Sequence, residues 1–130
     1  MGNLFDPTID ILSKSLDLHL VRHAVISNNI ANVETPYFKA RRVDFEAELQ
    51  KAVDASITGG EPVLRREIAS VQPSVSEDAE SELGQDLNTV DMDREMAALT
   101  KNDVKYSAAT QAVAQKFGLL KYAITEGGNR

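Results

Sequence analysis

His19 and His23 are the residues of this sequence whose spacing is best suited to holding a metal ion. On a helix, side chains four residues apart lie on the same face, and two imidazoles placed in this way can bind a divalent cation. No Glu follows the first histidine as in the zincin pattern, and no third ligand is evident. A polar patch that fixes the register of a helix pair is the simpler interpretation. We therefore expect neither a metal nor a cofactor.

Paired carboxylates are the other side chains that could carry out acid–base chemistry, namely Asp91 with Asp93 and Glu46 with Glu48. A helix start explains the first pair, because negative charge is stabilised there, and a solvated face explains the second. No glycine-flanked serine frames a Ser-His-Asp triad, and Gly59-Gly60 lacks the following Lys of a phosphate-binding loop. We expect this chain not to be an enzyme.

The composition of the chain disfavours several further classes of function. A chain of 130 residues with 42% hydrophobic residues is sufficient for one modest core. The net charge of −6 disfavours a nucleic-acid partner, and the absence of cysteine removes disulfides and thiol chemistry. No apolar run is long enough to span a membrane, and the N-terminus lacks the basic head and apolar run of a secretory signal. Export would therefore use a route without a cleaved signal peptide.

The N-terminal region, residues 1–32, predicts a helix that runs to about Ala31. Asp6 provides an N-cap oxygen, and Pro7 suits the first helical position because its missing N–H has no partner there in any helix. Steps of alternately three and four residues predict a seam, mostly apolar, along one face. Its members are Phe5, Ile9, Leu12, Leu16, His19, His23, Ile26 and Ile30.

The C-terminal region, residues 89–130, predicts a second helix that begins near Asn88 or Thr89 and ends at Gly127-Gly128. The same spacing gives a second seam, in which two polar residues interrupt the apolar ones. An ordinary amphipathic bundle helix has a similar stripe, so periodicity alone leaves a bundle and a coiled coil both open. The members are Met92, Met96, Leu99, Asp103, Tyr106, Thr110, Val113, Phe117, Leu120 and Ile124.

Helix length favours assembly with other molecules. The C-terminal helix should be roughly 54 Å long and the N-terminal one roughly 37 Å, whereas a compact chain of this size is only about 35 Å across. An antiparallel pair therefore leaves part of the longer seam uncovered. With Ile30 facing Met92, such a pair would place His19 opposite Asp103, so we expect these two polar residues to pair and fix the register.

The middle of the chain predicts less regular structure. Asp44 can cap a short helix over 44–55, with Phe45, Leu49 and Val53 on one face. Residues 57–88 contain seven acidic residues, two basic ones and several turn residues, which is typical of a flexible segment. The expected fold is therefore all-α: two long terminal helices, a turn and short helix over 33–56, and a mobile acidic segment over 57–88.

The turn after the first helix resembles the signature of flagellar rod and hook axial proteins, in which an Asn-x-Ala-Asn-x-x-Thr-Pro-Gly pattern precedes an aromatic and a basic residue. The family glycine is replaced by Tyr37 here, and glycine is the residue that takes positive φ without penalty. The residues that match are Asn29, Ala31, Asn32, Thr35, Pro36, Phe38, Lys39 and Ala40.

The C-terminal helix is similar to that of FlgB-type proximal rod proteins, over Val90–Met96, Leu99, Asn102, Tyr106 and Phe117–Ile124. The two resemblances cover roughly the first 45 and the last 40 residues. They imply a structural subunit of the flagellar basal body that takes part in motility and self-assembles through its terminal helices.

Further expectations follow from this resemblance. It implies export through the flagellar type III apparatus, and contacts with other rod subunits and with the membrane ring or its adaptor. A soluble coiled-coil adaptor or regulator with a single partner is the alternative from another class, and an enzyme with a hidden ligand site is the third.

Overall fold

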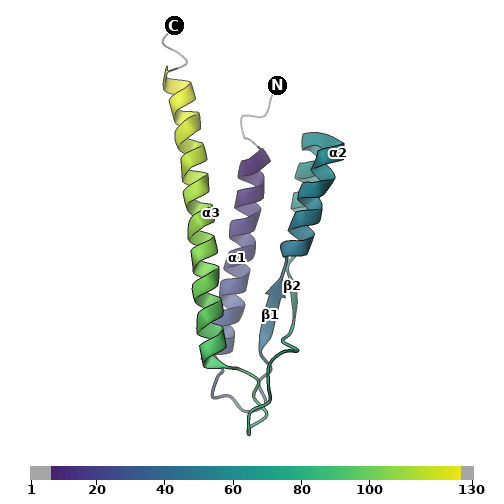
Figure 1. Ribbon diagram of the computed structural model, residues 1–130, viewed down its shortest axis with the longest axis vertical. Coiled ribbons are helices and arrows are strands. Elements are labelled where there is room, and N and C mark those ends of the chain that lie inside the picture. Colours follow the sequence, from purple (N-terminus) through teal and green to yellow (C-terminus); the bar gives the residue numbers. More distant parts are fainter. Residues whose placement is uncertain (1–6, 127–130) are drawn as a thin grey trace.

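Three helical elements and one small ribbon make up the fold. The computed structural model describes residues 7–126, except for the side chains of residues 56–58 and 126. α1 packs antiparallel against α3 and also contacts α2, which stands on the ribbon (Figure 1). No helix in the described range is long and apolar enough to cross a membrane. The elements are α1 (Pro7–Ala31), β1 (Arg41–Asp44), α2 (Glu46–Ser70), β2 (Ser74–Glu77) and α3 (Met92–Glu126).

The two predicted terminal helices are present. α1 ends at Ala31 as expected, while its proposed cap, Asp6, lies outside the described residues, as do Gly127 and Gly128 after α3. α3 begins at Met92, and its cap is Asp91, not Asn88 or Thr89. The Asp91 Oδ1 accepts the backbone N–H groups of Asp93, at 3.0 Å, and Arg94, at 3.2 Å, as an N-cap carboxylate does.

The middle of the chain differs from the expectation of a short helix followed by a flexible segment. α2 continues to Ser70 and is interrupted at Gly60, whose φ of 71° lies in the left-handed region that favours glycine. Pro62 then starts the second half of α2, which returns beside the first half (Figure 1). The turn residues therefore reverse the direction of the chain and make α2 a helical hairpin. The acidic composition of this segment predicted flexibility, although Leu64 and Ile68 hold its second half in the core.

A two-stranded ribbon also corrects the all-α expectation. β1 and β2 are antiparallel, with Arg41 opposite Glu77 and Asp44 opposite Ser74. The α2 hairpin makes this pairing possible, because it brings the chain back to the point at which it left the ribbon. Asp44 accordingly does not cap a helix but lies in β1, and α2 begins after Phe45 without a side-chain cap.

The apolar core lies between α1, the ribbon and α2, and not between α1 and α3. Ile11, Val25 and Leu49 pack against it from the side. Leu18 is its most deeply buried large side chain, at 2% exposure. The buried members are Leu18, Val43, Phe45, Ala52, Leu64, Ile68 and Val71.

Arg22 joins α1 to the ribbon and to the first turn of α2. Its guanidinium donates to the Val43 carbonyl oxygen at 2.6 and 3.0 Å and to both carboxylate oxygens of Glu46 at 2.6 and 2.7 Å. It also lies over the Phe45 ring, 4.3 Å from the centroid. Hydrogen bonds from Arg22 lower the pKa of Glu46 to about 2. This bidentate pair, with the bonds to Val43, joins α1 to β1 and to the start of α2.

We predict that Glu46→Gln lowers the free energy of unfolding at pH 7 by about 1 kcal/mol, because it weakens a bidentate pair whose carboxylate is half exposed. A lowered folded-state pKa stabilises the protein above the unfolded value and is lost as pH falls towards the folded value. The wild-type and Gln variants should therefore converge between pH 4.5 and about 2. Urea unfolding at several pH values measures this difference.

Glu48→Gln is the matched control, because Glu48 pairs with Lys51 on the exposed surface of the same helix. It should cost less than about 0.5 kcal/mol. Equal losses in the two variants, or a Glu46 effect that does not depend on pH, would contradict the role given to the Arg22 pair.

Candidate assembly site

Asn29 fixes the turn at the end of α1. It is 1% exposed, its Nδ2 donates to the Arg41 carbonyl at 2.7 Å, and its Oδ1 accepts the Arg41 N–H at 3.0 Å. An amide that satisfies both backbone groups of one residue substitutes for a strand partner. The first residue of β1 is thereby held against the last turns of α1.

Asn32 and Thr35 close the same turn from within. Asn32 Nδ2 donates to the Asn28 carbonyl at 2.8 Å, and the Thr35 hydroxyl donates to the Asn32 Oδ1 at 3.1 Å. Ala31, Thr35 and Pro36 are exposed, so this part of the predicted motif forms surface.

Asn88 and Thr89 complete the turn from the opposite end of the chain. Asn88 Nδ2 donates to three carbonyl oxygens, those of Asn32, Val33 and Thr35, at 2.8–3.0 Å. The Thr89 hydroxyl accepts the N–H of the buried Ala40 at 2.8 Å. Sequence reasoning assigned these residues to a helix start, because nothing local identifies partners more than 45 positions away.

The remaining motif residues join the same contact. The Phe38 carbonyl accepts the Thr89 N–H at 3.1 Å, and the Lys39 Nζ donates to the Leu87 carbonyl at 3.1 Å. Both side chains are half-buried. The predicted turn is therefore one half of a base formed by residues 29–40 and 84–90.

Tyr37 stands at the glycine position of the signature that this turn resembles, and it has a positive φ. Its φ is 63°, in the left-handed region, and its side chain is 71% exposed. Its N–H donates to the Asp86 carbonyl at 3.1 Å, so the contacts of the base hold this conformation. A non-glycine residue in this conformation carries local backbone strain.

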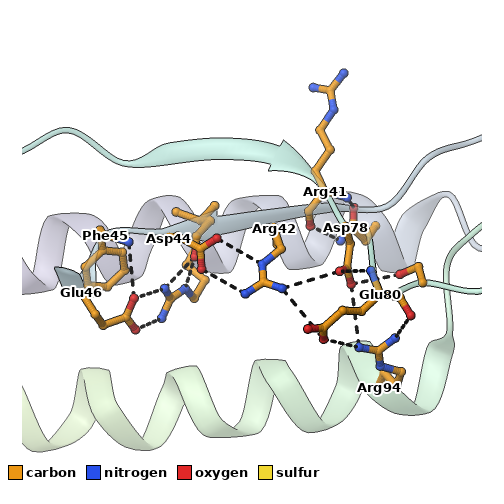
Figure 2. Close-up of polar contacts among 12 residues, drawn as sticks. Arg41, Arg42, Asp44, Phe45, Glu46, Asp78, Glu80 and Arg94 are labelled. Carbon is orange, nitrogen blue, oxygen red and sulfur yellow. Dashed lines mark hydrogen bonds and ion pairs between the residues drawn. The ribbon is translucent and has the colours of Figure 1, made fainter. Parts of the chain in front are cut away.

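Charged side chains connect the ribbon to the start of α3. Figure 2 shows the Arg42 guanidinium between Asp44 on one side and Asp78 and Glu80 on the other, with N–O distances of 3.1, 3.7 and 4.0 Å. Arg94 of α3 approaches the same two acidic residues, at 3.9 and 3.6 Å. The hydrogen bond and the charge of Asp44 raise the pKa of Arg42. The network holds the ribbon near α3 at an open groove of about 540 Å³.

Glu95 is buried beneath this network. Its side chain lies against Asn29, and its Oε2 has no hydrogen-bond partner among the described residues. Burial raises the pKa of Glu95, and the nearby negative charges of Asp78 and Asp91 add to this, while the Asn29 hydrogen bond and Arg94 act against it. The Glu95 carboxyl therefore joins the first turn of α3 to Asn29 at the end of α1.

The contact at the middle of the α1–α3 pair is polar. His19 Nδ1 lies 2.8 Å from the Asn102 Oδ1, and the Asn102 Nδ2 donates to the His19 carbonyl at 3.0 Å. Because that amide oxygen can only accept, Nδ1 of the histidine carries the proton. The predicted pair of His19 with Asp103 is therefore wrong, and Asp103 instead lies 3.2 Å from His23 on the exposed edge.

No set of three potential metal ligands is found in the described part of the chain. His19 and His23 each contact α3, and the His19 ring also packs edge-on against Phe45, with centroids 5.2 Å apart. The two histidines thus take part in helix docking.

The predicted seam residues of α1 mostly face the interior. Ile9 and Ile26 are buried, Leu12, Leu16 and Ile30 are half-buried, and Phe5 lies outside the described residues. In α3 the seam is more open, and no apolar residue between Met92 and Thr125 is fully buried. Leu99, Tyr106, Val113 and Leu120 are half-buried, whereas Met92, Met96, Phe117 and Ile124 are exposed. The pairing of the two stripes as a coiled coil stays a prediction.

We predict that Tyr37→Gly raises the free energy of unfolding by about 1 kcal/mol, because glycine takes a positive φ without the clash of a Cβ. Glu34→Gly is the control, since Glu34 is also exposed in this turn but does not have positive φ, and it should be destabilising. Chemical denaturation of the three proteins checks this. Destabilisation by both glycines would show that Tyr37 carries no backbone strain.

Sequence comparison finds relatives of this chain among known proteins. No protein-family model matches the chain. The flagellar basal body rod protein FlgB of Borrelia hermsii is 40% identical over 126 residues, which cover 88% of this chain and 93% of that protein. FlgB of Bacillus subtilis is 33% identical over 128 residues, covering 96% and 98%.

A more distant relative matches over the whole length. FlgB of Salmonella typhimurium is 27% identical over 140 residues, covering 99% of this chain and 100% of that protein. The similarity thus extends across the middle of the chain, for which the sequence motifs gave no resemblance. With relatives above 30% identity along nearly the full chain, this protein belongs to the FlgB family of flagellar basal body rod proteins, whose members are structural components and not enzymes.

Proposed function

We propose that this chain is a subunit of the proximal rod of the bacterial flagellum and that it assembles helically through α1 and α3. Family membership gives the structural role in the rod. The observation that supports this mode of assembly is the exposure of apolar side chains along α3. Between Met92 and Thr125 its only fully buried residues are the polar Glu95 and Asn102, while large apolar side chains remain exposed.

The exposed side chains of α3 provide the driving force for this assembly. Phe117 is 47% exposed, and Val104, Leu119, Tyr122 and Ile124 are between 61% and 66% exposed. Burial of such a side chain contributes roughly 1.5–3 kcal/mol. At 100° per residue, Phe117 and Ile124 lie on one side of α3, and Val104, Leu119 and Tyr122 lie on another. A helix with exposed apolar residues on two sides is suited to pairing with neighbouring helices on both of them.

The overhang of α3 supports the same proposal. Starting from the contact of His19 with Asn102, equal rises along antiparallel helices place Pro7 opposite roughly residue 114. The remainder of α3 extends beyond α1 (Figure 1). In an assembled rod, helices of adjacent subunits would cover this part, and the exposed turn residues Thr35 and Pro36 would contact a neighbour at the base.

The partners in this proposal are other rod subunits and the adaptor between the membrane ring and the rod. The subunit would reach the periplasm-spanning rod through the flagellar type III export apparatus, without a cleaved signal peptide. A cysteine-free chain without a disulfide is compatible with export in the unfolded state. No small-molecule substrate and no nucleic acid take part.

We predict that Phe117→Asp in the native gene abolishes rod assembly and motility, because a charge on the apolar face would be desolvated between helices. The purified variant should unfold within about 0.5 kcal/mol of the wild type, since the side chain is exposed in the single chain. Isolation of basal bodies and a swimming assay measure the first effect, and thermal unfolding measures the second.

Gln72→Asp is the control. Gln72 is exposed and lies between α2 and β2, outside the two terminal helices. This variant should leave the rod intact. Complete rods in the Phe117→Asp strain would refute assembly through this face.

Sedimentation of the purified chain separates the rod subunit from the adaptor. A concentration-dependent, open-ended association fits a rod subunit, because heterologous contacts do not close. A stable helical dimer at low concentration, unchanged on dilution, would instead favour an adaptor that binds one partner.

A further inference from the structure

The two edges of the β1–β2 ribbon differ in how their backbone groups are satisfied. The Ala40 carbonyl accepts the Asp78 N–H at 2.9 Å, immediately before the paired strands. Hydrogen-bonded and non-hydrogen-bonded pairs alternate in an antiparallel ladder, so Arg42 with Ser76 is the next hydrogen-bonded pair. The residues between these pairs direct their N–H and carbonyl groups away from the ribbon, towards its two edges.

The outer edge of β1 is closed by α1. The Asn29 side chain bonds the N–H and the carbonyl of Arg41, at 3.0 and 2.7 Å. Further along the strand, Arg22 donates twice to the Val43 carbonyl, at 3.0 and 2.6 Å. Side chains of α1 thus take the place that a third strand would occupy. This edge is therefore closed to a strand from another molecule.

The outer edge of β2 is open. Val75 and Glu77 each direct one N–H and one carbonyl to this side, and none of these groups has a hydrogen bond in the part of the chain that the structure describes. All four residues of β2 are exposed, and β1 lies between α1 and β2 (Figure 1). Only water can satisfy these groups in the single chain. Such an edge is a template for an added strand.

The side chains along this edge indicate which strand it accepts. Glu77 is exposed and has no ion pair within the described residues. Two β2 strands of different copies, paired antiparallel, would bring two Glu77 carboxylates near each other, which is unfavourable. A basic side chain beside Glu77 would be favourable. Val75 lies on the same face of the strand and is 47% exposed, so an apolar side chain beside it would gain burial.

We propose that β2 is the docking edge for an extended segment of a different protein, which adds to the ribbon as a third strand. The segment has an apolar residue beside Val75 and a Lys or Arg beside Glu77. Main-chain hydrogen bonds supply the affinity, and these two side chains select the segment. Pro73 has no N–H to offer, so it ends the edge at the start of β2. The inference rests on the proposed rod function and gives the chemistry of one partner in it.

Proline substitutions test the geometry of the edge in the purified chain. Val75→Pro removes an N–H that faces solvent, which an edge strand tolerates, so its midpoint of urea unfolding should equal that of the wild type. Ser76→Pro removes an N–H on the side that pairs with Arg42, so its midpoint should be clearly lower. Equal losses in the two variants would show that the edge of β2 is not open.

The same variant in the native gene tests the docking. Val75→Pro should reduce the number of complete rods and the swimming rate by about tenfold, because the added strand loses one main-chain hydrogen bond and its register. Val75→Thr is the matched control, since it keeps the N–H and the β-branched shape, and it should assemble as the wild type does. Wild-type numbers of rods with Val75→Pro would overturn the inference.

Photo-cross-linking identifies the occupant of the edge. A photoreactive phenylalanine derivative replaces Ser76, which is exposed and points to the opposite face from Val75 and Glu77. Irradiation of cells should join the subunit to a different protein, and mass spectrometry should locate the link in a segment that has an apolar and a basic residue two positions apart. Links between copies of this chain alone, links to another kind of segment, or no link would overturn the inference. None of these results would affect the proposed rod function, because that function fails only if the chain is absent from isolated rods.

Discussion

In the middle of the α1–α3 pair, the amide of Asn102 contacts His19 through both its oxygen and its nitrogen, and both residues are buried. Because this contact is directional, it fixes the register of the two long helices. The apolar core lies on the other side of α1, against the ribbon and α2. α3 is thus positioned by the fold while its apolar side chains remain available, which is the state that a subunit requires before it joins a helical assembly.

The base of the molecule uses the same kind of interaction. Asn29 satisfies the carbonyl and amide groups of Arg41 at the start of β1, and Asn88 satisfies carbonyl groups of the turn, because buried backbone groups without partners are costly. The rigidity of this base explains how Tyr37 keeps a left-handed conformation. One end of the molecule is therefore held by hydrogen bonds and ion pairs, while the other end presents an uncovered helix.

Local sequence signals were sufficient for the two terminal helices and for the motif-bearing turn, because Pro7, the apolar spacing and the Asn-rich helix end act over short distances. They were insufficient for α2, where Gly60 and Pro62 reverse a helix that the acidic composition suggested was absent. The His19 partner was missed by one position. One residue rotates the contact by roughly 100°, which places Asn102 in the interface and Asp103 at its edge. The roles of Asn88 and Arg94 depend on contacts between distant segments, so no local pattern could have identified them.

Hydrogen exchange along α3 tests the central claim, which is that this helix is held by its first half and left open in its second. In the purified monomer, amides around Asn102 should exchange slowly, while those beyond roughly residue 115 should exchange quickly because no partner helix covers them. In isolated rods the same late amides should become protected. Equally slow exchange along the whole of α3 in the monomer would contradict the account.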